Sequence, residues 1–187
     1  MKRIMIAALM LAVGVLYSGP AGGMDDTRET RMKNNSAPTR SAVFAGGCFW
    51  CTEADFEKVD GVIEAVSGYT GGGLENPTYK QVSGGGTGHV EAIEVRYDPK
   101  KVSYQQLLEV FWRHVDPTDP GGQFVDRGDQ YRSVIFYATD EERQLAEASK
   151  KRLEASDRFE RPVATEILPL GTFYRAEDYH QDYYKKN

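Results

Sequence analysis

Alternating apolar and polar positions predict a set of short β-strands. The clearest is HVEAIEVRYDP, residues 89–99, in which every second side chain from His89 to Tyr97 points to one face of the strand. That face is the more apolar of the two, so we expect it to lie against the core. Alternating runs, or short apolar runs ended by glycine, predict further strands over residues 41–47, 62–70, 132–139 and 162–170.

Apolar positions three and four residues apart predict helices between these strands. The clearest helix covers residues 103–115, which carry one apolar stripe and begin with Ser103 and Gln106 at capping-box spacing. A second, largely exposed helix is expected after Thr139, whose side chain is suited to cap it. The predicted helices besides the first cover residues 49–61, 140–157 and 175–186.

The order of these elements indicates an α+β domain. Strands and helices alternate irregularly, which favours a central, mainly antiparallel or mixed sheet with helices packed against it. Two long irregular segments, residues 71–88 and 116–131, separate the elements. Loops of that length inside a compact domain are often functional.

The N-terminal segment has the pattern of a secretory signal peptide. A basic start precedes an apolar run over residues 4–17, and small residues follow as far as Ala21. We therefore expect a signal peptide at residues 1–21 and an exported protein, periplasmic or secreted, with an uncleaved membrane anchor as the alternative. Polar residues 22–40 are expected to form a flexible linker before a domain over residues 41–187.

Composition narrows the class of protein further. The chain of 187 residues is long enough for one sizeable core and too short to expect two. A net charge of -5, with no long run of one sign in the domain, gives no reason to expect nucleic acid as a partner. Nothing in the sequence resembles a dimer seam, so we expect a monomer. Export would place the chain in an oxidising compartment, where cysteines tend to pair.

Both cysteines of the chain lie in one motif, GGCFWCTE, residues 46–53. A structural zinc site needs about four ligands, whereas the chain offers these two thiols and three scattered histidines, which argues against a metal. A structural disulfide between Cys48 and Cys51 would close a very small loop and contribute little stability. A redox role for the two thiols is the third possibility.

The position of Cys48 favours the redox role. It follows a predicted strand and two glycines at the start of a predicted helix, where amide N–H groups and the helix dipole would stabilise a thiolate. Cys51 lies about one turn further on, within reach of a sulfenic acid on Cys48. A thioredoxin-like exchange protein would also carry Cys-x-x-Cys after a strand. The bulky Phe49 and Trp50 between the thiols look more like a small apolar pocket, or ordinary core, than an open exchange surface.

One carboxyl group occupies the apolar face of the strand over residues 89–99. Glu91 points to the same side as Ile93 and Val95, next to the glycine-rich segment. Burial without a cation would raise the pKa of this carboxyl and let it act as an acid at neutral pH. The alternative is a solvated or salt-bridged carboxylate at the edge of the sheet.

These motifs together resemble those of the peptide methionine sulfoxide reductases, A class. The resemblance covers roughly residues 43–184 and rests on GGCFWCTE, SGYTGG, NPTYKQV, TGHVEAIEVRYDP, DPTDPGGQFVDRGDQYRS and AEDYHQDY in that order. It implies a two-layer α+β sandwich with a central mixed sheet and helices packed against it. It also implies reduction of methionine S-sulfoxide, free or in proteins, with recycling by a thioredoxin-like dithiol and with no metal, flavin or nicotinamide cofactor.

The resemblance implies roles at matched positions as well. Cys48 is expected to attack the sulfoxide sulfur, and Cys51 to resolve the resulting sulfenic acid as a disulfide. The other implied roles are a pocket for the substrate methyl group made by Phe49 and Trp50, an acid at Glu91, hydroxyl donors to the sulfoxide oxygen at Tyr69 and Tyr131, and a polar member of the site at Asp126.

Two features depart from the family's pattern. Many members resolve the sulfenic acid with cysteines near the C-terminus, whereas the tail DYHQDYYKKN has none, which leaves Cys51 as the resolving thiol. Asp129 stands where threonine is frequent, and nothing in the sequence explains that change. The competing classes are a secreted thiol–disulfide exchange protein that acts on cysteine substrates, and a binding module with a structural disulfide.

Overall fold

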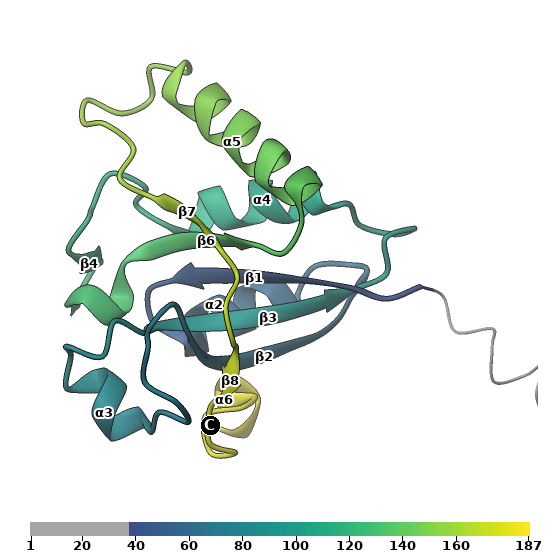
Figure 1. Ribbon diagram of the computed structural model, residues 1–187. Helices are drawn as coiled ribbons and strands as arrows, with labels where there is room; N and C mark the ends of the chain where they lie inside the picture. Colours follow the sequence, from purple (N-terminus) through teal and green to yellow (C-terminus); the bar gives the residue numbers. More distant parts are fainter. Residues whose placement is uncertain (1–37) are drawn as a thin grey trace, which may run out of the picture. The chain divides into compact units, whose positions relative to one another are not determined.

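Six strands form one mixed sheet, in the spatial order β7-β6-β1-β3-β2-β8 (Figure 1). The computed structural model describes residues 38–187, so the expected signal peptide at residues 1–21 and most of the expected linker lie outside the described residues. Strands β6 and β7 run parallel, and the other neighbours in this sheet run antiparallel. The strands are β1 (Arg40–Gly46), β2 (Val62–Thr70), β3 (Val90–Tyr97), β6 (Ser133–Tyr137), β7 (Glu166–Pro169) and β8 (Tyr174–Arg175).

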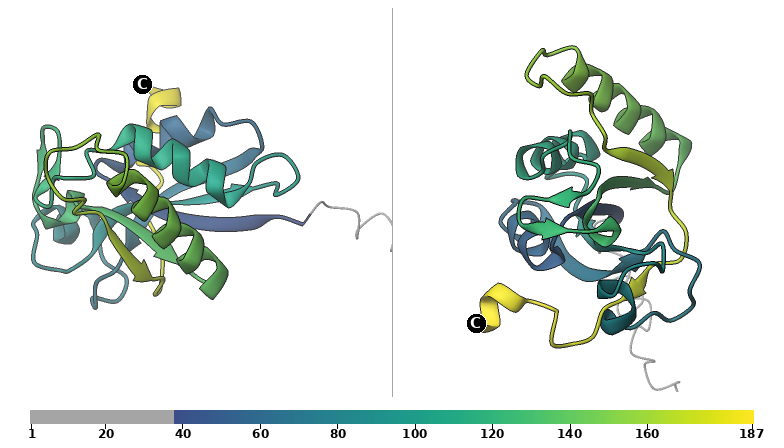
Figure 2. Two further views of the ribbon diagram at one scale, coloured as in Figure 1. Left: turned by 90° about the horizontal axis from the view of Figure 1, so that it is seen from above. Right: turned by 90° about the vertical axis from the view of Figure 1, so that its left-hand side faces the viewer.

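Three helices cover one face of this sheet: α2 (Phe49–Glu57), α4 (Tyr104–His114) and α5 (Asp140–Glu154). The right-hand view of Figure 2 shows α2 and α4 on one side of the sheet and the chain between β7 and β8 on the other. The ring of Phe44 joins the two layers, because it stacks on Phe56 of α2 at 5.1 Å and on Phe111 of α4 at 5.5 Å between ring centroids. The predicted α+β sandwich with a mixed sheet is therefore confirmed.

A smaller apolar cluster lies on the opposite face of the sheet. It contains Val43 and Ala45 of β1, and Val90 and Ala92 of β3, with partners from β6. The chain after β7 covers these side chains and passes across the strands in Figure 1. Both faces of β1 and β3 are thus buried near the centre of the sheet, which is why the apolar alternation of β3 is incomplete.

Helix α4 begins as the sequence predicts. The Ser103 hydroxyl accepts a hydrogen bond from the Gln106 N–H at 3.2 Å, and the Gln106 side chain accepts one from the Ser103 N–H at 2.8 Å. This reciprocal pair satisfies two amide groups that the helix itself cannot use. The apolar stripe of α4 is buried throughout, and it consists of Tyr104, Leu107, Leu108 and Phe111, with Val115 just beyond the helix.

The structure departs from the prediction in the long loops and the tail. The first loop contains α3 (Tyr79–Ser83), and the second contains the hairpin of β4 (Gly122–Gln123) and β5 (Asp126–Arg127). The single helix predicted over residues 175–186 is wrong: β8 comes first, and only α6 (Tyr183–Lys186) is helical.

The edge of β2 explains the shape of the tail. The Gln181 amide donates to the Ser67 carbonyl at 2.9 Å and accepts from the Ser67 N–H at 3.0 Å. The Ala176 N–H also donates to the Ser67 carbonyl, at 2.9 Å. These bonds to a strand edge replace the hydrogen bonds of a continuous helix, and they hold the tail against the sheet.

Candidate active site

Cys48 lies at the junction between β1 and α2. Gly47 turns the chain there with φ +89°, and a Cβ at this position would lie 2.6 Å from the Cβ of Gln123, so only glycine fits. Cys48 is the N-cap residue of α2, and its carbonyl accepts from both the N–H and the hydroxyl of Thr52, at 3.2 and 3.1 Å. The backbone around the thiol is therefore held on both sides.

Glu91 lies beneath the start of α2, with 2% of its surface exposed. Its Oε2 accepts a hydrogen bond from the Phe49 N–H at 3.0 Å, which joins β3 to the first residue of the helix. Burial raises the pKa of this carboxyl to about 7, helped by the charge of Asp126 and opposed by the Phe49 N–H. The prediction of a buried, core-facing carboxyl at Glu91 is confirmed.

The thiol of Cys48 shares this desolvated environment. Burial, together with the charge of Glu91, raises the pKa of Cys48 to about 12, although the amide groups of Cys51 and Trp50 act to lower it. The expectation that the helix N-terminus would make Cys48 a thiolate is therefore wrong for the substrate-free protein. Desolvation outweighs the stabilisation that the amide groups supply.

Aromatic rings surround the first turn of α2. The Phe49 ring lies 6.4 Å from Tyr79 and 4.9 Å from His180 between centroids. Trp50 stacks on Tyr183 at 3.6 Å with the planes only 4° apart, and its indole N–H donates to Nδ1 of His180 at 3.0 Å. His180 is 1% exposed, and burial lowers its pKa, so its ring stays neutral and accepts this bond. Together these rings make an apolar wall beside the thiol.

Three polar residues from the two long loops complete the site: Tyr79 from the first loop, and Asp126 and Tyr131 from the second. Burial raises the pKa of both Tyr79 and Tyr131, and the charges of Glu91, Asp126 and Cys48 raise both pKa values further. All of these groups therefore lie close enough to act on one another electrostatically. Both phenols keep their protons at neutral pH, so each is a hydrogen-bond donor within electrostatic range of the thiol and the buried carboxyl.

Comparison with known proteins identifies the family. The model of the family "Peptide methionine sulfoxide reductase" matches residues 40–187. The chain belongs to the peptide methionine sulfoxide reductases.

The relatives of this reductase differ in how much of their length this chain matches. Peptide methionine sulfoxide reductase MsrA of Listeria innocua is 59% identical over 145 residues, which cover 78% of this chain and 82% of that protein. Peptide methionine sulfoxide reductase MsrA/MsrB of Vibrio cholerae is 52% identical over 187 residues, which cover 100% of this chain but 50% of that protein. The chain thus spans half the length of that relative.

Solved structures of the family share the fold. Mxr1 from Saccharomyces cerevisiae in reduced form has a TM-score of 0.76 and 34% identity, over 82% of this chain and 88% of that one. The same protein in complex with Trx2 has a TM-score of 0.57 and 25% identity, over 80% and 87% of the two chains. Family and fold together favour a reductase over an exchange protein or a binding module.

The structure brings the predicted site residues of the reductase together, and Tyr69 pairs directly with Glu91 across β2 and β3, but the Tyr69 hydroxyl is directed to another partner. The Tyr69 ring is fully buried 5.8 Å from Phe49, but its hydroxyl donates to Oε2 of Glu177 at 2.9 Å. A phenol has a single proton to donate. Tyr69 therefore supports Glu177 in this arrangement and is not a free donor to a substrate oxygen, so that part of the prediction is not supported.

Sequence reasoning missed three residues of the reductase site. Tyr79 is the free phenol beside Phe49, and Glu177 holds its backbone by accepting from the Tyr79 N–H at 2.9 Å. His180 orients Trp50. All three lie in NPTYKQV and AEDYHQDY, which carry the family resemblance, but strand and helix periodicity does not rank residues in irregular segments.

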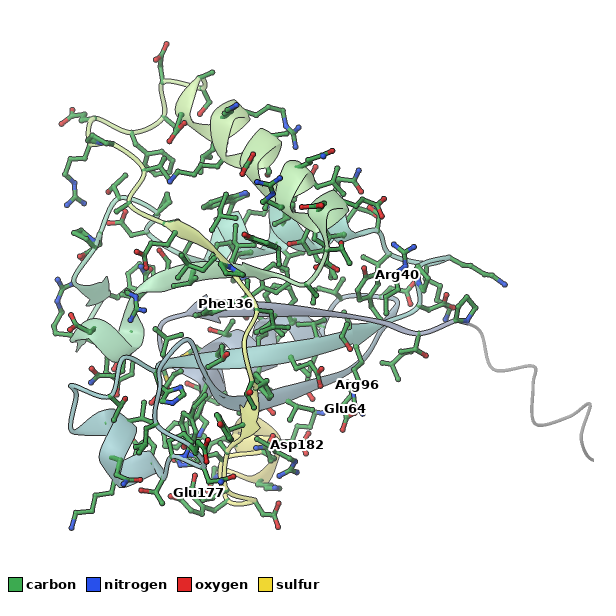
Figure 3. All side chains as sticks on the ribbon, in the orientation of Figure 1. Arg40, Glu64, Arg96, Phe136, Glu177 and Asp182 are labelled. Carbon is green, nitrogen blue, oxygen red and sulfur yellow. The ribbon has the colours of Figure 1, made fainter. Side chains whose placement is uncertain are left out.

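Glu177 lies close to the C-terminal segment that carries Asp182 (Figure 3).

Within residues 38–187 no group of three or more His, Cys, Asp or Glu side chains could hold a metal ion. Over the same range, no helix is long and apolar enough to cross a membrane. Asp129 is exposed at the start of a short 3-10 turn, and nothing in the structure explains its difference from threonine.

Proposed function

We propose that this chain reduces methionine S-sulfoxide, free or within proteins, to methionine. The observation that carries the proposal is the position of Glu91, which is 2% exposed with a pKa of about 7, accepts from the Phe49 N–H next to Cys48, and acts electrostatically on the Cys48 thiol. A carboxyl with that pKa is partly protonated at neutral pH, and it can give a proton to the sulfoxide oxygen. The phenols of Tyr79 and Tyr131 supply further donors, while Phe49 and Trp50 surround the substrate methyl group.

In the first step, the Cys48 sulfur attacks the substrate sulfur as the sulfur–oxygen bond breaks. Glu91 protonates the departing oxygen, which leaves as hydroxide while a sulfur–sulfur bond joins Cys48 to the substrate. The hydroxide then attacks the Cys48 sulfur, the sulfur–sulfur bond breaks, methionine leaves, and Cys48 keeps the oxygen as a sulfenic acid. The proton lost by the thiol restores Glu91, so the step needs no outside acid or base. Because the thiol is neutral in the free protein, we propose that it loses its proton in the substrate complex. A proton on Glu91 in that complex removes the negative charge that raises the pKa of Cys48.

In the second step, Cys51 attacks the sulfenic acid, water leaves, and a Cys48–Cys51 disulfide forms. Side chains three apart on a helix have Cβ atoms about 5–6 Å apart, whereas a disulfide needs about 3.5–4.5 Å. The first turn of α2 must therefore adjust, and the non-helical φ and ψ of Cys48 at the N-cap allow it.

A thioredoxin-like dithiol is the proposed reductant of this disulfide. Cys51 is exposed, so an outside thiolate can reach it. The complex of Mxr1 with Trx2 supports the same class of partner. No further cofactor enters the proposed cycle, and we propose that the protein acts as a monomer without nucleic acid.

The Cys51→Ser variant tests the two cysteine roles separately. Mixed with an oxidised methionine peptide and no reductant, it should release about one methionine per enzyme molecule and keep a trappable sulfenic acid on Cys48. The Cys48→Ser variant should release none. Methionine formation by Cys48→Ser, or repeated thioredoxin-driven turnover by Cys51→Ser, would contradict the assignment.

Export is proposed as well, from the sequence of residues 1–21. In a bacterial host, the protein should appear in the periplasmic fraction or the medium, shortened at its N-terminus. A full-length product in the membrane fraction would indicate the uncleaved anchor instead. A full-length product in the cytoplasm would contradict export.

A further inference from the structure

Cys51 has a polar neighbour that the proposed cycle does not yet use. Its Sγ lies 3.4 Å from the hydroxyl oxygen of Tyr184, the second residue of α6. The two residues are far apart in sequence, so the contact exists only because the tail returns to α2. Sulfur–oxygen contacts of this length are weak hydrogen bonds when the sulfur is a thiol, and stronger ones when it is a thiolate.

Two contacts hold α6 against α2 on either side of Tyr184. Before it, Tyr183 stacks on Trp50 at 3.6 Å. After it, Lys185 pairs with Glu57 of α2 at 2.6 Å. Because both neighbours bind α2, the backbone of α6 is held where the Tyr184 side chain reaches Cys51. The contact is therefore part of how the tail docks.

The protonation states decide which atom donates. The hydrogen bond to Cys51 and the charge of that thiol raise the pKa of Tyr184 to about 12, so the phenol keeps its proton throughout the neutral range. A thiolate has no proton and can only accept. Once Cys51 is deprotonated, Tyr184 must therefore be the donor, and the bond becomes a charge-assisted one that favours the thiolate.

We propose that Tyr184 is a positioning residue for the resolving step: its hydroxyl holds and stabilises the Cys51 thiolate that attacks the sulfenic acid. In that step the Cys51 sulfur bonds to the Cys48 sulfur, and the bond from Cys48 to oxygen breaks. The oxygen leaves as water with the proton that Cys51 lost, so no outside oxidant or reductant is needed. This inference rests on the proposed function, because it requires Cys51 to be the resolving thiol.

The surface around Cys51 is open to solvent. A hollow of about 340 Å³ lies beside it, lined by Ala54, Asp55, Lys58 and Tyr184. Solvent competes for the thiolate there, and Tyr184 itself is 58% exposed, so the contribution of one hydrogen bond is modest. We expect a rate effect of about three- to tenfold rather than a complete loss.

The test is Tyr184→Phe, which removes the hydroxyl and keeps the ring. After mixing with oxidised peptide and no reductant, methionine release and the loss of free thiols are followed in the same reaction. Methionine release should keep the wild-type rate, while disulfide formation slows about three- to tenfold and its pH–rate profile moves to higher pH. Tyr137→Phe, the same change at the end of β6, which lies toward the opposite end of the strand order from β8, should leave both rates unchanged.

A second readout does not depend on turnover. In the Cys48→Ser background, alkylation of Cys51 by iodoacetamide reports its thiolate, and Tyr184→Phe should shift the alkylation profile to higher pH.

The outcomes separate the two proposals. Unchanged disulfide formation and alkylation in Tyr184→Phe would overturn the role of Tyr184, and so would an equal slowing of methionine release, which indicates a general structural effect. If the wild-type protein releases no methionine, the proposed function fails instead.

Discussion

Glu91 allows the electrostatics of the site to be tested through stability as well as rate. Its carboxyl has a pKa of about 7, against 4.5 for an ordinary glutamate, and burial is the main cause. Each pKa unit corresponds to about 1.4 kcal/mol, so the folded protein carries an ionised Glu91 at a cost of about 3 kcal/mol relative to the unfolded chain. The residue is almost fully buried, so solvent screens little of this cost.

The sign of the effect follows from which state ionises first. Below about pH 4.5 the carboxyl is protonated in both states and costs nothing. Between about pH 4.5 and pH 7 the unfolded chain ionises while the folded protein keeps the proton, so the free energy of unfolding falls as the pH rises. Above about pH 7 both states are ionised, and the full cost is present.

The Glu91→Gln variant removes this ionisation and keeps an acceptor for the Phe49 N–H. Its unfolding free energy, measured in urea, should exceed that of the wild type by up to about 3 kcal/mol at about pH 8, and the difference should shrink steadily toward about pH 4.5. Other ionisable groups are common to both proteins and cancel in the difference. The same variant should slow methionine release by about 10²–10³, because it has lost the acid.

Glu94→Gln is the matched control for Glu91→Gln. Glu94 lies on the opposite face of β3 and pairs with Arg96 at 3.4 Å near the surface. Its substitution should change the unfolding free energy by less than about 1 kcal/mol. If the wild-type and Glu91→Gln curves stay parallel from about pH 4.5 to about pH 8, Glu91 does not hold its proton and the acid role loses its basis.

The remaining predictions concern the groups around this carboxyl. Tyr79→Phe should slow methionine release about tenfold, because it removes a hydrogen-bond donor from the site. Tyr69→Phe should mainly lower the free energy of unfolding, by about 1–2 kcal/mol, because Glu177 loses the donor that Tyr69 supplies. Equal losses of rate in the two variants, measured by rapid quench, would contradict this distinction. Gly68→Ala should destabilise the protein by about 1–3 kcal/mol in urea, since its Cβ would lie 2.3 Å from the Phe173 ring and 2.5 Å from the Tyr174 carbonyl. Gly73→Ala, with nothing within 4 Å of the new Cβ, is its control, and equal stability of the two variants would refute the packing argument.

The sequence by itself determined the elements that periodicity and capping specify. The strands β1, β2, β3 and β6 and the helices α4 and α5 follow from local patterns: alternation in β3, the apolar stripe and capping box of α4, and the Thr139 cap of α5. The position of Cys48 at a strand-to-helix junction and the inward direction of Glu91 follow from the same patterns. These features depend on neighbours in the chain, so the chain alone reveals them.

Only the tertiary structure shows how deeply each group is buried and which distant segments of the chain come into contact. Only the depth of the site shows that desolvation outweighs the helix N-terminus at Cys48, since a helix start in a sequence carries no measure of burial. Likewise, the phenols of Tyr69 and Tyr79 look alike in the sequence, and the position of Glu177 on the returning tail separates them. The contact of Tyr184 with Cys51 has the same origin, because hydrogen bonds between distant segments are set by packing and leave no local pattern.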